Sequence, residues 1–138
     1  MKILYTAEAT ATGDGRSGKV RSSDGQIDTP LAVPTEMGGP GGATNPEQLF
    51  AAGFSACFHN ALRVVARRAK ADVTGSEVTA RVGIGPDTGG AFRLSVTLFV
   101  HLPGVDRTVA EDLTTRAHQV CPYSRATRGD LDLTVEIV

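Results

Sequence analysis

The chain has 138 residues, of which 14 are Lys or Arg and 15 are Asp or Glu, so its formal net charge at pH 7 is −1. A chain of this length fits a single domain over residues 1–138 and can bury a hydrophobic core. The balanced charge provides no basic excess to neutralise phosphates or anionic lipids, which disfavours nucleic-acid and membrane-surface partners.

The first 35 residues alternate short β-prone runs with glycine-containing turns. The runs are Ile3 to Thr10, Lys19 to Ser22 and Gln26 to Val33. This pattern predicts a meander of antiparallel strands. The first run turns polar too early for a signal peptide, so we expect a cytoplasmic protein.

A long helix is expected from Asn45 to about Ala71. Asn45 is a favourable cap, Pro46 suits the first helical position, and Gln48 completes a capping box. Residues 49–65 are apolar nearly all round, which predicts a central, buried helix. The longest apolar run, residues 49–58, is too short to span a bilayer, so we expect no membrane partner.

The second half of the chain contains another hairpin pattern and a second helix signal. Val78 to Ile84 and Phe92 to Leu102 alternate apolar and polar residues. Thr108 and Glu111 form a capping box before a helix, and Leu131 to Ile137 closes the chain as a strand. The fold class is therefore α+β, with two antiparallel sheet segments and a buried helix between them.

The two cysteines are candidates for a catalytic or redox-sensing pair, because a reducing cytosol disfavours a structural disulfide. Free cysteine is often only a small buried hydrophobe, so an inert pair is one alternative. A zinc site of Cys57, His59, His118 and Cys121 is another. On a helix, however, Cys57 and His59 point about 200° apart, and the other two ligands do not close a structural site. We therefore expect no metal, and His59 is a poor candidate for the base that activates Cys57.

A thiolate inside an apolar helix needs a cation, because burial raises the pKa of a thiol. Arginine stays protonated, and its fork of donors could hold a sulfur anion. Arg16 lies in the glycine-rich turn 13–18, where the backbone can approach another element, so it is our candidate. An ordinary exposed turn arginine is the alternative.

Three segments carry a resemblance to a known family. Residues 5–13 (YTAEATATG), 44–58 (TNPEQLFAAGFSACF) and 121–129 (CPYSRATRG) resemble the organic hydroperoxide resistance proteins of the Ohr/OsmC family, and the third is closer to the Ohr branch. The resemblance covers essentially the whole chain. It implies an OsmC-like fold, an intertwined homodimer whose long central helices are wrapped by antiparallel sheets.

The same resemblance implies a cytoplasmic antioxidant enzyme, a thiol-dependent peroxidase that acts on alkyl and lipid hydroperoxides without a cofactor. Cys57 takes the place of the attacking cysteine and Cys121 that of the resolving cysteine. Arg16 takes the place of the family's arginine and Glu47 that of the glutamate that holds it, although the turn before Arg16 is one residue longer here. The implied reductant is a dithiol, a lipoylated protein.

Phe50, Phe54 and Phe58 surround Cys57 in the sequence and are expected to form an apolar substrate pocket. Glu47 and Cys57 are ten residues apart, about 15 Å along a helix, so we expect Glu47 to act on the cysteine of a second copy. A redox sensor or ligand-binding protein without rapid turnover is the alternative from another functional class.

Overall fold

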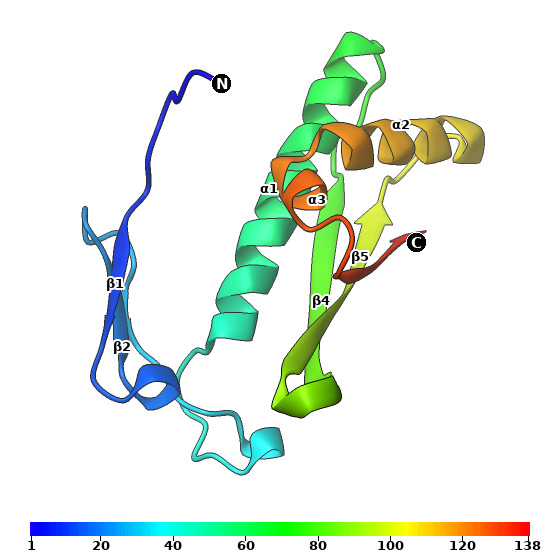
Figure 1. The fold of residues 1–138 in the computed structure, drawn as a ribbon. Helices are drawn as coiled ribbons and strands as arrows, with labels where there is room; N and C mark the ends of the chain where they lie inside the picture. The colour runs from blue at the N-terminus through cyan, green and yellow to red at the C-terminus, as the bar shows by residue number, and fades with distance from the viewer. The chain divides into compact units, whose positions relative to one another are not determined.

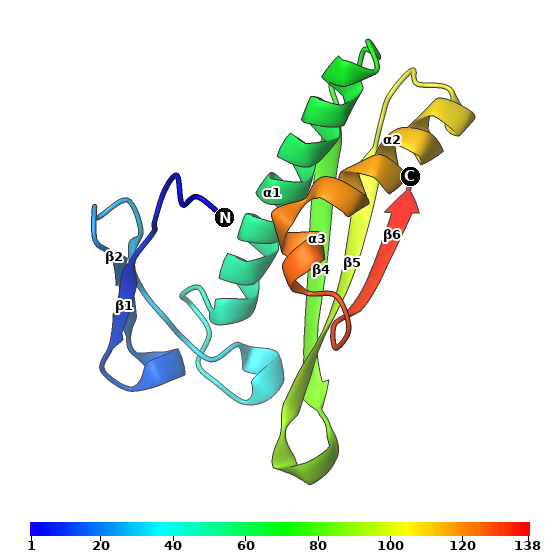
Figure 2. The same cartoon turned by 45° about the horizontal axis from the view of Figure 1, so that its top comes forward.

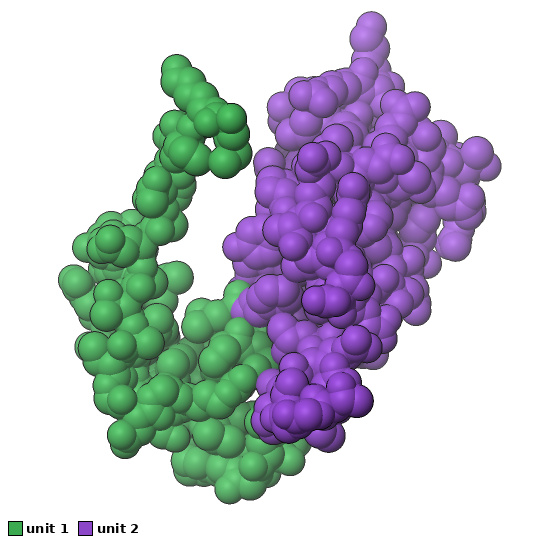
Figure 3. Space-filling view, in the orientation of Figure 1, with its two compact units in different colours: residues 1–49 green, residues 50–138 purple.

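The computed structural model describes residues 1–138, which divide into two compact units, Met1–Leu49 and Phe50–Val138 (Figure 3). Each unit is described by itself below. The single domain expected over residues 1–138 stays a prediction.

The first unit contains a three-stranded antiparallel sheet of β1 (Ala9–Thr12), β2 (Lys19–Ser22) and β3 (Asp28–Pro30), in that order (Figure 1). The predicted meander is therefore confirmed. Short 3-10 turns follow β1 and β3, η1 (Gly15–Ser17) and η2 (Thr35–Met37). Gly18 ends the first turn. The position requires glycine, because a Cβ there would clash with the carbonyl oxygen of Thr12.

The first strand begins later than the sequence predicts. Ala9 pairs with Ser22, the last residue of β2, and the Glu8 carbonyl accepts from the Ser23 N–H at 2.9 Å, so residues 3–7 have no partner strand in the chain. Tyr5 in this segment is 78% exposed. The β-prone run of residues 3–10 is therefore longer than the strand it contains, because pairing depends on where the neighbouring strand ends.

The long helix α1 (Pro46–Arg68) starts where the sequence predicts. The side-chain oxygen of Asn45 accepts a hydrogen bond from the backbone N–H of Gln48 at 2.9 Å, which confirms the cap. The side chain of Gln48 accepts from the Thr44 hydroxyl at 2.8 Å, in place of closing the expected capping box. The helix ends before the expected position, and Lys70 follows in a left-handed conformation at φ 56°.

The second unit contains the sheet β4 (Glu77–Pro86), β5 (Phe92–His101) and β6 (Asp132–Ile137), in that order. As predicted, β4 and β5 form an antiparallel hairpin, joined through the 3-10 turn η3 (Thr88–Gly90). β6 is parallel to β5, so the expectation of a wholly antiparallel sheet is wrong here. The helices α2 (Arg107–Val120) and α3 (Pro122–Ala126) lie between the two strands in sequence, and such a crossover returns the chain to the starting edge. The α+β class is confirmed.

The cap of α2 also differs from the prediction. Asp106 is the capping residue, and its carboxylate accepts from the N–H of Thr108 at 3.1 Å. Glu111, expected to complete the box with Thr108, pairs instead with Arg107 at 3.1 Å. An ionised carboxylate competes well with a threonine hydroxyl for a free helix N–H.

Both long helices lie on the same face of the β4–β5–β6 sheet (Figures 1 and 2). The core between them is formed by fully buried apolar side chains, chiefly Phe54, Phe58, Leu62, Val96, Leu98, Val100 and Leu113. α1 buries one side only, and Ala52 and Ala56 on the other side are exposed. By length and composition α1 could cross a membrane, but its buried residues pack as those of a core helix do.

Candidate active site

The structure brings the two cysteines together within the second unit. The Sγ atoms of Cys57, in the middle of α1, and Cys121, between α2 and α3, lie 3.7 Å apart, and both thiols are free. A disulfide needs about 2.05 Å between the sulfurs, which is within reach of side-chain rotation. The arrangement can form a disulfide.

Local backbone chemistry places Cys121 at this point. It precedes Pro122, and a residue before proline avoids the helical region, so α2 ends at Val120. Cys121 adopts an extended conformation with φ −62° and ψ 122°, and its N–H is bonded to the carbonyl of Ala117 at 2.8 Å. The side chain is fully buried, whereas that of Cys57 is half-buried.

The environment of Cys57 opposes ionisation. Burial raises the pKa of the Cys57 thiol, and the hydrogen bond with Cys121 raises it as well. The backbone N–H of Tyr123, in the first turn of α3, acts in the other direction and lowers the pKa. A reactive thiolate at this position needs more stabilisation than the second unit supplies.

Neither the short helix α3 nor the contact of Tyr123 with α1 is predicted from the sequence. The Tyr123 ring packs edge-on against Phe54 with centroids 5.6 Å apart. A Cβ on Gly53 would lie 3.1 Å from the Tyr123 hydroxyl oxygen, so the absence of a side chain at Gly53 makes room for the ring. The available signal was Pro122 directly after Cys121, since proline favours the first position of a helix.

Arg16 and Glu47, both in the first unit, form a bidentate ion pair. Nη1 of Arg16 donates to Oε2 of Glu47 at 2.7 Å, and Nη2 donates to Oε1 at 2.6 Å. These hydrogen bonds lower the pKa of Glu47 and raise that of Arg16, so both groups stay charged. The Arg16 side chain is still 38% exposed, which leaves part of the guanidinium free for another group. The longer turn before Arg16 does not prevent this pairing.

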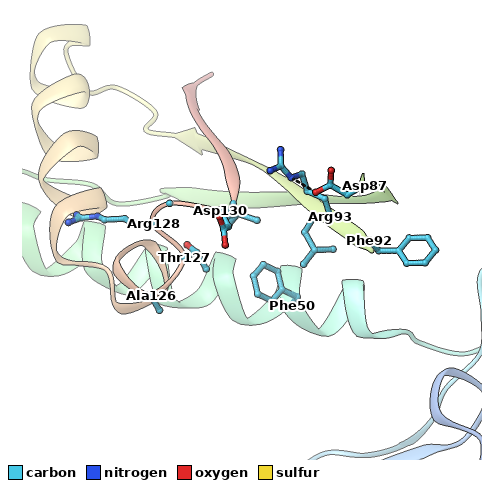
Figure 4. Close-up of a pocket in the computed structure, with 11 residues that line it drawn as sticks. Phe50, Asp87, Phe92, Arg93, Ala126, Thr127, Arg128 and Asp130 are labelled. Carbon is cyan, nitrogen blue, oxygen red and sulfur yellow. Dashed lines mark ion pairs between the residues drawn. The ribbon is translucent and has the colours of Figure 1, made fainter. Parts of the chain in front are cut away.

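The three phenylalanines differ in accessibility. Phe54 and Phe58 have no exposed surface and belong to the core, so they support the neighbourhood of Cys57 from inside. Phe50 lies two turns before Cys57 and faces a cavity of about 670 Å³. Figure 4 shows its ring projecting from α1 toward the strands, while Arg93 is turned toward Asp87, its ion-pair partner at 3.2 Å. Of the three, Phe50 alone lines this cavity.

The histidines of the zinc alternative lie in different environments. Nε2 of His59 is 2.9 Å from the hydroxyl of Ser76. Nδ1 of His118 is buried without a hydrogen-bond partner, and burial, followed by the charge of Arg128, lowers its pKa. The described residues contain no group of three or more potential metal ligands.

Comparison with known proteins gives consistent results. Residues 39–136 match the family described as OsmC-like protein. The organic hydroperoxide resistance protein of Xanthomonas axonopodis pv. citri is 50% identical over 138 residues, covering 99% of this chain and 96% of the relative. An organic hydroperoxide resistance protein OsmC of Legionella pneumophila has a crystal structure that matches with TM-score 0.94 and 46% identity, covering 99% of this chain and 98% of the other. The crystal structure of OhrB of Bacillus subtilis matches with TM-score 0.90 and 42% identity, covering 99% and 100%.

Proposed function

The chain belongs to the OsmC-like protein family, on the branch of the organic hydroperoxide resistance proteins, and we propose that it is a cysteine-based peroxidase that reduces organic hydroperoxides. The relatives' names support a role in resistance to organic hydroperoxides and in the response to oxidative stress. The peroxidase mechanism is our inference from the thiol pair.

The observation that carries the proposal is the 3.7 Å separation between a half-buried thiol and a fully buried one. The Cys57 thiolate attacks the distal oxygen of the hydroperoxide, the O–O bond breaks, and the alkoxide takes a proton to leave as an alcohol. Cys57 becomes a sulfenic acid, and Cys121 attacks its sulfur, releases water and forms the disulfide. One hydroperoxide and two thiols thus give one alcohol, one water and one disulfide.

The Arg16–Glu47 pair supplies the positive charge that the thiolate needs. In the proposed mechanism Arg16 stabilises the sulfur anion and the charge that develops on the peroxide oxygen. Glu47 fixes the orientation of the guanidinium through its two hydrogen bonds. Both partners of the ion pair belong to one chain, and Glu47 lies ten positions from Cys57 on α1, about 15 Å along a regular helix.

We therefore propose that the ion pair of one copy serves Cys57 of a second copy, in a homodimer with two identical sites. The exposed alanines Ala52 and Ala56, on the side of α1 that faces away from the core, support an association through this helix. Each site then needs both chains.

The apolar part of the cavity, formed by Phe50, Leu94 and Leu131, supports an organic substrate, and charged side chains line the rest. The cavity at Phe50 lies on the same side of the helix as Cys57 and could receive an alkyl tail whose peroxide end reaches the sulfur. Phe54 and Phe58 contribute by holding the walls in place from the core. Each buried methylene of the substrate contributes about 0.8 kcal/mol, which hydrogen peroxide cannot offer.

The second substrate is a dithiol that reduces the Cys57–Cys121 disulfide, and family resemblance makes a lipoylated protein our proposed donor. No cofactor is required. The proposed location is the cytoplasm, where thiols are kept reduced.

A steady-state assay tests the proposal. Cumene hydroperoxide and hydrogen peroxide are compared at equal concentration, each with dihydrolipoamide and then with thioredoxin as the reductant. We expect sustained turnover with cumene hydroperoxide and dihydrolipoamide, and a lower kcat/KM for hydrogen peroxide. Oxidation that stops after one equivalent per chain with every reductant would favour a redox sensor instead.

A further inference from the structure

The two sulfurs of the pair differ in the access they allow from outside. Cys121 has no exposed surface, and the side chains around it belong to the core of the second unit. Cys57 is half-buried and packs at the margin of the same core. Because Cys121 is already covered within a single chain, association with another copy or another protein can only add to this cover.

Reduction of a disulfide by an external thiol depends on access to the sulfur that is attacked. The incoming thiolate approaches in line with the S–S bond, from the side opposite the sulfur that leaves. Cys121 has no exposed surface and belongs to the same core as Leu113 and Ala117 of α2, so any approach to its sulfur has to pass through packed side chains. The Cys57 side chain keeps some exposed surface within the chain, so an approach to its sulfur does not have to cross the core.

We propose that the reducing dithiol attacks Sγ of Cys57 and that Cys121 is the leaving thiol. The inference rests on the Cys57–Cys121 disulfide of the proposed function and assigns the direction in which that bond is broken. The thiolate of the reductant forms a bond to the Cys57 sulfur, and the electron pair of the S–S bond goes to Cys121, which takes a proton. The product is a mixed disulfide between the reductant and Cys57.

The mixed disulfide explains why the reductant should be a dithiol. Cys121 stays beside the mixed disulfide and can attack Cys57 again, which expels the reductant and restores the original disulfide. A second thiol on the reductant competes by attacking its own first sulfur, so that Cys57 leaves as a thiolate and a cyclic disulfide departs. The attacking form of Cys57 is thereby regenerated directly.

The pKa of the thiol that leaves also affects the exchange rate, but burial raises the pKa of Cys57 while the N–H of Tyr123 lowers it, so these two effects oppose each other. Leaving-group effects change the exchange rate gradually with the pKa. Steric cover acts more strongly, since a thiolate cannot react with a sulfur it cannot touch unless the fold opens. Access therefore decides which sulfur is attacked.

The test uses the wild-type protein and a monothiol, which cannot complete the second step. The disulfide is first made with diamide, so that the experiment needs no peroxidase activity. The oxidised protein is then treated briefly with 2-mercaptoethanol and quenched with acid and N-ethylmaleimide, and both cysteine peptides are analysed by mass spectrometry. A matched sample treated in guanidinium chloride, where both sulfurs are accessible, shows that either adduct can be detected.

In the native protein we expect mercaptoethanol on Cys57 and N-ethylmaleimide on Cys121. This labelling should exceed the reverse labelling by more than about tenfold. A local opening that costs about 1.4 kcal/mol is enough to produce a tenfold ratio. Equal labelling, or mercaptoethanol mainly on Cys121, would overturn the proposal, as would failure of diamide to form the disulfide. Loss of peroxide turnover with the expected labelling would overturn the proposed function alone.

Discussion

Replacing Arg16 with methionine removes the cation that we propose for the Cys57 thiolate. Burial raises the pKa of this thiol above the ordinary value of about 8.5, so without a cation less than about 3% is ionised at pH 7. An opposite charge within about 4 to 6 Å lowers a pKa by about 1 to 3, which multiplies the ionised fraction by at least about ten. We expect Arg16→Met to lower the rate of peroxide reduction at pH 7 by about 10-fold to about 100-fold.

The sign of the effect sets its pH dependence. Because the variant loses the stabilisation of the thiolate, its ionised fraction of Cys57, and with it the alkylation rate, should rise with pH and approach the wild-type value only above the ordinary thiol pKa of about 8.5. The pKa is measured directly from the rate of Cys57 alkylation by iodoacetamide, in a Cys121→Ser background that leaves one thiol.

The matched control is Arg21→Met. Arg21 lies on β2 of the same unit and pairs with Asp28 at 3.6 Å, so its loss removes the same charge from the same sheet. It should leave the alkylation profile unchanged. If the profiles of Arg16→Met and wild type coincide while thermal unfolding shows both folded, the thiolate does not depend on Arg16 and the reasoning is refuted.

Four further outcomes follow from the same account. Cys57→Ser should abolish peroxide reduction, whereas Cys121→Ser should reduce one equivalent and then overoxidise to a sulfinic acid detected by mass spectrometry; sustained turnover in Cys57→Ser would contradict the assignment. Phe50→Ala should lower kcat/KM for cumene hydroperoxide by about 10-fold or more and leave kcat/KM for hydrogen peroxide nearly unchanged. An equal loss for both substrates would show that Phe50 does not bind the organic part of the substrate. Mixing Cys57→Ser with Glu47→Ala under conditions that exchange subunits should restore activity at one site per mixed dimer, and exchange verified by native mass spectrometry without recovery would place Glu47 at the cysteine of its own chain. The ion pair lowers the pKa of Glu47, so the stability that Glu47 contributes to the fold is present above about pH 4.3 and is lost as the pH falls through its lower folded-state pKa. Urea titration should therefore show that acidification lowers the unfolding free energy of the wild type more than that of Glu47→Gln.

The parts of the fold that depend on local signals could be predicted from the sequence. The start of α1 follows from Asn45 and Pro46, and the β4–β5 hairpin follows from its period of two. The features that could not be predicted depend on how segments far apart in the sequence pair with each other. The parallel direction of β6 depends on the path of α2 and α3, and the late start of β1 depends on where β2 ends.

The candidate site shows the same division. Family resemblance was enough to name Arg16 and Glu47, and the structure adds their two hydrogen bonds. The sequence could not distinguish Phe50 from Phe54, because both are apolar residues on one helix and only packing shows that Phe54 is buried while Phe50 lines a cavity. The backbone N–H of Tyr123 could not be foreseen at all, since its contact with Cys57 joins residues far apart in the chain.

The most direct test of the central claim counts how much alcohol each chain produces. The reduced protein is mixed with excess tert-butyl hydroperoxide, and tert-butanol is quantified with and without dihydrolipoamide. We predict one equivalent of alcohol per chain without the dithiol, with Cys57 and Cys121 joined in a disulfide, and many equivalents in proportion to the dithiol when it is supplied. A single equivalent per chain under both conditions would contradict a peroxidase function, because the thiol pair would then be oxidised once per chain, as in a redox sensor, without catalytic turnover.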